Sequence, residues 1–153
     1  LPAFLRYGWN AGYGEGWALY SEWLGYEMGL YDDPYQRFGR LDMEMLRAMR
    51  LVVDTGLHAK SWSREQSIRY MLDHSSFDRG TIEQEVDRYI AWPGQATAYK
   101  IGELFIRRLR SKAEQALGER FDLRAFHRQV IDTGPIPLAV LERKIDDWIA
   151  RQR

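Results

Sequence analysis

The sequence has no cysteine, which excludes disulfide bonds and zinc sites built from thiolates. It has no run of eighteen apolar residues, so no segment is suited to cross a bilayer as a helix. It has no excess charge of either sign, because 22 Lys and Arg side chains balance 22 Asp and Glu side chains. Because the chain has no basic excess to neutralise phosphates, nucleic acid is not expected as a partner.

Aromatic side chains are abundant: they make up 14% of the 153 residues, with six Trp and nine Tyr. Such a content favours closely packed helices over an aromatic-lined cleft. The hydrophobic fraction of 45% and the length suit a single domain over residues 1–153 with a sizeable core.

Apolar residues recur every three or four positions along most of the chain, which is the spacing of helices with one buried face. No stretch alternates apolar and polar residues for more than four positions, so strands are not expected. The sequence therefore predicts an all-α fold, a multi-helix packing of six to seven helices. The predicted helices lie at about 13–30, 34–55, 64–72, 82–90, 95–117, 123–130 and 138–148.

Start signals support several of these helices. Asp33 can cap a helix whose first turn contains Pro34, and Asp122 can cap another. Ser63 and Thr81 are each followed three residues later by Gln, the spacing of a capping box. The helix after Asp33 carries one apolar face, formed by Phe38, Leu41, Met45, Met49 and Val52.

The segment 14–22, GEGWALYSE, combines two carboxylates with two glycines on a predicted helix. Glu15 and Glu22 are seven residues apart and therefore share a face. Each helical glycine costs about 1 kcal/mol relative to alanine, so Gly14 and Gly16 indicate that a second helix or a bound group approaches the backbone. From spacing alone, the simpler interpretation is two surface carboxylates near a helix start, where the helix dipole favours them.

The same segment resembles the glutamate-bearing helix of gluzincin metallopeptidases, whose pattern is N-E-G-[FW]-A-x-Y-x-E. More closely, the chain resembles the bacterial family called domain of unknown function 885, whose members look like gluzincins. The resemblance covers nearly the whole chain and is most specific in EGWALYSEWLGYEMGLYDDP and YIAWPGQATAYKIGEL. The similar stretches are 15–34, 37–58, 63–72, 89–104, 121–127 and 141–149.

In gluzincins, zinc is held by the two histidines of H-E-x-x-H and by one glutamate of a second helix. The resemblance therefore implies that Glu15 is the third zinc ligand and that Glu22 orients a histidine ligand or a neighbouring helix. The sequence has no H-E-x-x-H, and its histidines are His58, His74 and His127. In the family that motif lies upstream, so we expect a C-terminal fragment of a larger catalytic domain that does not hold zinc alone.

His58 follows Asp54-Thr55-Gly56-Leu57 and, by itself, suits a histidine favoured by the dipole at a helix C-terminus. The resemblance implies instead that His58 and Tyr99 are catalytic, donating hydrogen bonds to the oxyanion formed on a peptide carbonyl. Gln95, four residues before Tyr99, would bind substrate on the same helix face. The alternative is that Tyr99 is a core aromatic and Gln95 a polar residue at a helix start.

Arg50 could bind a peptide carboxylate through its planar guanidinium, although a solvated surface charge is the default interpretation. His74 and His127 are interpreted as surface or capping histidines. A di-metal carboxylate bundle is disfavoured, because no Glu is followed by His three residues later.

Two functions remain open at this stage. The resemblance implies the C-terminal portion of a zinc-dependent peptidase, with a peptide substrate and with the upstream polypeptide as its partner. The alternative is a non-catalytic helical scaffold or binding domain. In either case we expect exposed apolar surface on the Trp17 side or the Glu15 side, through which the isolated chain can self-associate.

Overall fold

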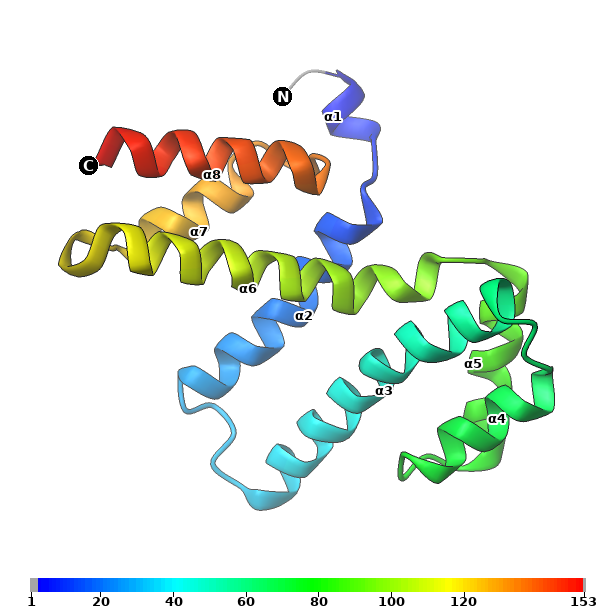
Figure 1. Cartoon of the computed structure of the whole chain (residues 1–153). Helices are drawn as coiled ribbons and strands as arrows, with labels where there is room; N and C mark the ends of the chain where they lie inside the picture. The colour runs from blue at the N-terminus through cyan, green and yellow to red at the C-terminus, as the bar shows by residue number, and fades with distance from the viewer. Residues whose placement is uncertain (1–2, 153) are drawn as a thin grey trace. The chain divides into compact units, whose positions relative to one another are not determined.

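The computed structural model describes residues 3–152, which form helices joined by short turns (Figure 1). The all-α prediction is confirmed, with eight helices and no strand in this range. The structure has one helix more than the predicted six to seven, because the five-residue α1 is too short to show a helical period in the sequence. The helices are α1 Ala3–Tyr7, α2 Ala11–Glu27, α3 Pro34–Ala59, α4 Arg64–Asp73, α5 Arg79–Ala91, α6 Ala98–Leu117, α7 Leu123–Ile131 and α8 Leu138–Gln152, with 3-10 turns η1 Gln95–Thr97 and η2 Gly118–Arg120.

The chain divides into two compact units, and each is described by itself. Unit 1 comprises Leu1–Tyr20 with Ile101–Arg153, and unit 2 comprises Ser21–Lys100. Both divisions fall inside helices, so α2 and α6 each contribute residues to both units. A single domain over residues 1–153 stays a prediction. No helix among the described residues combines the length and apolar character that crossing a membrane requires.

Side-chain caps fix the starts of α3, α4, α5 and α7. Asp33, Ser63 and Asp122 each accept a hydrogen bond from a backbone amide two or three residues later, as predicted. The start of α5 differs from the prediction. Asp78 is the cap and accepts hydrogen bonds from the amide and the hydroxyl of Thr81, which therefore lies inside the helix.

The helix α3 ends at Ala59, four residues beyond the predicted end at residue 55. The helix continues through Gly56 to Ala59, and the chain then turns at Ser61, whose φ is 55°. A Cβ at Gly56 would lie 2.6 Å from the ring of Trp62. Gly56 is therefore needed for close packing inside the helix rather than for a C-terminal turn.

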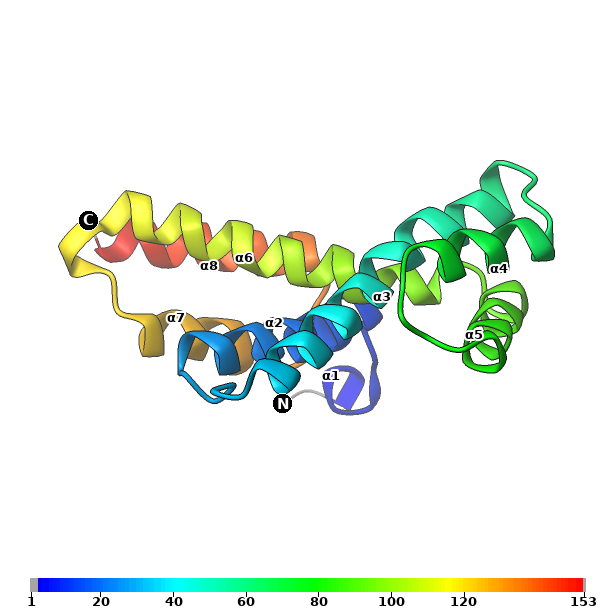
Figure 2. The ribbon, with the colours of Figure 1, turned by 90° about the horizontal axis from the view of Figure 1, so that it is seen from below.

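In unit 2 the second half of α3 packs on α4 and α5, which lie beside it in both views (Figures 1 and 2). Apolar side chains from the three helices and η1 form one core. Its buried members are Leu46, Met49, Val53, Ile68, Met71, Ile82, Val86, Tyr89 and Ala96. The apolar face predicted for α3 is therefore buried only in part, at Met49.

In unit 1 the helices α2 and α6 cross at glycines. A Cβ on Gly16 would overlap the backbone of Gly102, and a Cβ on Gly102 would overlap the carbonyl oxygen of Gly12. A Cβ on Gly14 would overlap the ring of Trp9. Of the two explanations for these glycines, the second helix is the one that accounts for Gly16. The rest of the core comes from α6, α7 and α8, with Ile106, Leu109, Phe126, Val130, Leu141 and Ile145 fully buried.

Candidate functional site

Glu15 lies in the unit 1 part of α2, where its side chain is half-buried between the two close-packed glycines. Trp17 and Tyr20 of the same segment surround His127 from α7. The Tyr20 hydroxyl and His127 Nε2 lie 2.9 Å apart, and the Trp17 and His127 rings meet edge-on with centroids 5.5 Å apart. His127 is therefore a half-buried part of an aromatic cluster, and its interpretation as a surface or capping residue was wrong.

Glu22 lies in unit 2, where its carboxylate pairs with Arg47 of α3 at 3.0 Å. The hydroxyl of Tyr31 donates to the backbone carbonyl of Glu22 at 3.3 Å. Both contacts join the end of α2 to the chain that follows it, so Glu22 links α2 with a neighbouring helix.

Four predicted site residues of unit 2 meet around Tyr89 of α5. We call them, with Glu85, Arg88 and Tyr89, the Tyr89 cluster: Arg50, His58, Glu85, Arg88, Tyr89, Gln95 and Tyr99. Its members come from α3, α5, η1 and the first turn of α6. Sequence distances of up to 49 residues separate them, so the fold rather than local spacing brings them together.

Arg50 is the centre of this cluster. Its Nε donates to the Tyr89 hydroxyl at 3.1 Å, and its Nη2 pairs with Glu85 at 2.8 Å. The flat face of the guanidinium lies over the Tyr99 ring, 4.6 Å from the centroid. Arg50 is only 7% exposed, and its buried Nη1 has no hydrogen-bond partner within the described residues. This is not the solvated surface charge of the default interpretation.

One carboxylate oxygen of Glu85 accepts three hydrogen bonds, from Arg50 at 2.8 Å, Arg88 at 3.1 Å and Tyr89 at 2.6 Å. Burial alone would raise the pKa of Glu85. The hydrogen bonds from Tyr89, Arg50 and Arg88 and the charge of Arg50 outweigh burial, so the pKa of Glu85 is lowered from its ordinary value. Burial raises the pKa of the Tyr89 hydroxyl, which therefore stays protonated and donates to Glu85.

Gln95 and His58 contact neighbouring residues of α5, Arg88 and Tyr89. Gln95 accepts a hydrogen bond from Arg88 at 2.6 Å, and the Arg88 guanidinium lies over the Tyr89 ring. His58 Nε2 lies 3.0 Å from the backbone carbonyl of Tyr89. Because a carbonyl only accepts, Nε2 carries the proton in this contact, and Nδ1 donates only when the ring is protonated.

Asp54, which sequence reasoning did not single out, holds the turn that precedes Tyr99. Both of its carboxylate oxygens accept from the amide of Gly94, at 3.1 and 3.0 Å. Gly94 has φ 79°, a conformation that favours glycine. The Asp54–Gly94 contact joins the stretches DTGLH and WPGQ. No local signal reveals it, because the two residues are 40 positions apart.

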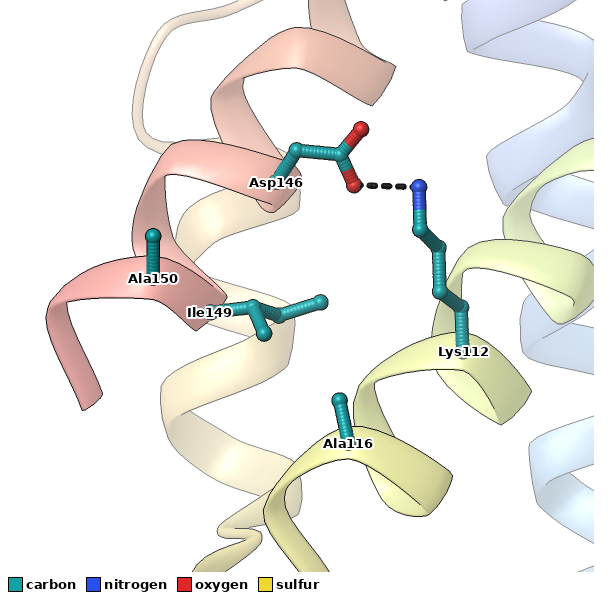
Figure 3. A pocket seen from close by; sticks show the side chains of 5 residues that line it. All are labelled: Lys112, Ala116, Asp146, Ile149 and Ala150. Atoms are coloured by element: carbon teal, nitrogen blue, oxygen red, sulfur yellow. Dashed lines mark ion pairs between the residues drawn. The ribbon is translucent and has the colours of Figure 1, made fainter. Parts of the chain in front are cut away.

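A separate hollow in unit 1 lies between α6 and α8 and has a volume of about 230 Å³ (Figure 3). Lys112 and Asp146 point toward each other at its rim and form an ion pair. Its other lining residues are Ala116, Ile149 and Ala150. The hollow contains none of the predicted site residues, and its two charged side chains are paired with each other. We therefore do not assign the candidate functional site to it.

No three His, Asp or Glu side chains in residues 3–152 lie together in a way that could hold a metal ion. The donor set of the described chain therefore does not fit a zinc site by itself, since such sites use three or four protein ligands.

The sequence profile of the bacterial proteins of unknown function called DUF885 matches residues 1–145. A crystal structure described as the putative lipoprotein from Colwellia psychrerythraea is 48% identical, with a TM-score of 0.97. The match covers 99% of this chain and 26% of that one, so this chain spans about a quarter of its relative's length. No curated protein matches. The chain thus belongs to the DUF885 family of bacterial proteins of unknown function.

Proposed function

We propose that this chain is the C-terminal portion of a zinc-dependent peptidase, which hydrolyses peptide bonds when the whole polypeptide is present. The observation that carries the proposal is the Tyr89 cluster. Arg50, His58, Gln95 and Tyr99, each chosen from sequence as a substrate-binding or catalytic residue, are joined through Tyr89 and Arg88.

The chemistry of the cluster suits a substrate that accepts hydrogen bonds and becomes negatively charged during the reaction. Peptide hydrolysis places a negative charge on the carbonyl oxygen, and fixed donors lower the barrier most when they are already oriented. Tyr99 is held by the face of Arg50, and His58 by its bond to the Tyr89 carbonyl. In this proposal both donate to the oxyanion, His58 through Nδ1 in its protonated form.

The sequence suggested that Arg50 binds a peptide carboxylate through two of its nitrogens, but its contacts favour a different role. Two of its nitrogens already bond Tyr89 and Glu85, so it does not present an open fork. It supplies instead a buried positive charge against Tyr99, which favours negative charge at the substrate nearby. Gln95 keeps its substrate-binding role, with Arg88 fixing the orientation of its amide.

Glu15 is proposed as a zinc ligand on the strength of the motif EGWALYSE and its half-buried position in α2. The remaining ligands would come from polypeptide outside these 153 residues. The contacts within the Tyr89 cluster also suit the alternative, a non-catalytic helical domain in which the cluster contributes only to stability.

The test is steady-state hydrolysis of peptide libraries by the full-length protein and by Tyr99→Phe. We expect the variant to lose kcat by about 10²-fold with little change in KM, as for other single oxyanion donors. Tyr35→Phe, at a highly exposed tyrosine outside the cluster, is the control and should be unchanged. Absence of peptide hydrolysis in the full-length protein, or equal kcat in Tyr99→Phe, would favour the non-catalytic domain.

A further inference from the structure

The apolar face of α3 changes from buried to exposed along the helix. Met49 is 2% exposed and belongs to the unit 2 core. One to three turns earlier, Phe38, Leu41 and Met45 are 61%, 56% and 46% exposed. We call these three residues the open stripe. Their spacing of three and four places them in line with Met49, so the open stripe continues the core surface beyond the helices that cover it.

A hollow runs along the open stripe. Phe38 and Met45 line it from α3, and the end of α4 with the following loop forms the opposite wall. Its volume is about 460 Å³. The wall is fixed, because both the amide and the hydroxyl of Ser76 donate to Asp42 of α3. His74 on the same wall is stacked on Tyr70, with ring centroids 4.4 Å apart. The hollow is therefore a shallow, open groove that is apolar at Phe38 and Met45 and polar along the opposite wall.

We propose that the open stripe is the docking site for an apolar segment of the same polypeptide that lies outside residues 1–153. Two observations select this occupant. The groove is continuous with an existing core, and contiguous exposed apolar surface of this kind marks an interface. In addition, a relative with 48% identity aligns to 99% of this chain but is only 26% covered by it, so such proteins contain much more chain to be packed.

The spacing of the open stripe describes the partner segment. Anchors at three- and four-residue intervals on one helix accept the ridges of a second helix. The occupant is therefore an amphipathic helix whose apolar side faces Phe38, Leu41 and Met45. This inference does not depend on peptidase activity, because it concerns packing alone.

Two methionines of α3 provide the test. Met45 lies in the open stripe, and Met43, two residues earlier, lies on the opposite side of the helix. Their exposures are similar, 46% and 37%. Hydrogen peroxide converts accessible methionine to the sulfoxide, and peptide mass spectrometry gives the rate at each position. Met71, which is fully buried, reports on unfolding.

In the 153-residue chain we expect Met43 and Met45 to be oxidised at comparable rates. In the full-length polypeptide Met45 should slow by about tenfold or more while Met43 keeps its rate. Equal rates for Met45 in the two proteins would overturn the proposal, as would a gene that encodes no further residues. Protection of Met45 already present in the 153-residue chain would also overturn it, and its loss on dilution would identify a second copy as the occupant.

A matched pair of substitutions gives an independent measurement. Met45→Glu should leave the melting temperature of the 153-residue chain unchanged, because the side chain is exposed there. The same substitution should lower the melting temperature of the full-length polypeptide, while Met43→Glu should lower it much less. A full-length protein that tolerates both substitutions equally would contradict docking at the open stripe.

Discussion

At the scale of single residues, the Tyr89 cluster depends on one carboxylate. Glu85 pairs with both Arg50 and Arg88 and accepts the hydrogen bond of the Tyr89 hydroxyl. A buried arginine that loses its partner keeps its charge and its desolvation cost. The free energy of unfolding should therefore be sensitive to this position, although Glu85 is not itself a predicted site residue.

We predict that Glu85→Gln lowers the free energy of unfolding by about 3 kcal/mol at pH 7. The pKa of Glu85 is lowered on folding, so its charge stabilises the fold above its ordinary value of 4.5 and loses this effect as the pH falls below it. The difference between the two proteins in urea denaturation should therefore shrink in acid. Glu83→Gln, at a solvent-exposed pair with Arg79, should cost less than about 1 kcal/mol.

Spacing along the sequence identified the cap residues, which act within one helical turn, but not Asp54 and Glu85, which act across the fold. Asp33, Ser63 and Asp122 were found because a cap and its amide are two or three residues apart. Asp54 and Glu85 were not found, because their hydrogen-bond partners, Gly94 and Arg50, lie 40 and 35 positions away in the sequence.

At the scale of helices, the crossing of α2 and α6 requires glycine on both sides. The sequence indicated a close approach at Gly14 and Gly16 from their cost in a helix. It did not identify Gly102 or Trp9, because helix packing partners are set by the whole fold. The same limit applies to α3, whose apolar face was predicted correctly as a pattern while its partial exposure was not.

We predict that Gly16→Ala destabilises the protein by about 2–3 kcal/mol, because the new methyl group meets the backbone of Gly102 and the helices must separate. Gly39→Ala is the control. Gly39 lies inside α3 with nothing within 4 Å of its added Cβ, so alanine should stabilise the helix by about 0.5–1 kcal/mol. Thermal or urea denaturation measures both. Equal effects of the two substitutions would contradict the crossing.

At the scale of the whole molecule, the chain is a DUF885 family member that spans about a quarter of a solved relative. The all-α class was predictable, because helical periodicity repeats along most of the sequence. The division into Leu1–Tyr20 with Ile101–Arg153 and Ser21–Lys100 was not, because it falls inside two continuous helices. In the proposed peptidase the other metal ligands would come from polypeptide outside these 153 residues, because residues 3–152 hold no group of three side chains that could bind a metal.

The measurement that tests this account most directly is the zinc content of the purified full-length protein and of Glu15→Gln, determined by elemental analysis. We predict about one zinc per chain in the parent protein and a large loss in Glu15→Gln. Glu27→Gln, at an exposed position on the same helix, should keep its zinc. Unchanged zinc occupancy in Glu15→Gln, or a full-length protein that binds no zinc, would contradict the assignment of Glu15 as a ligand.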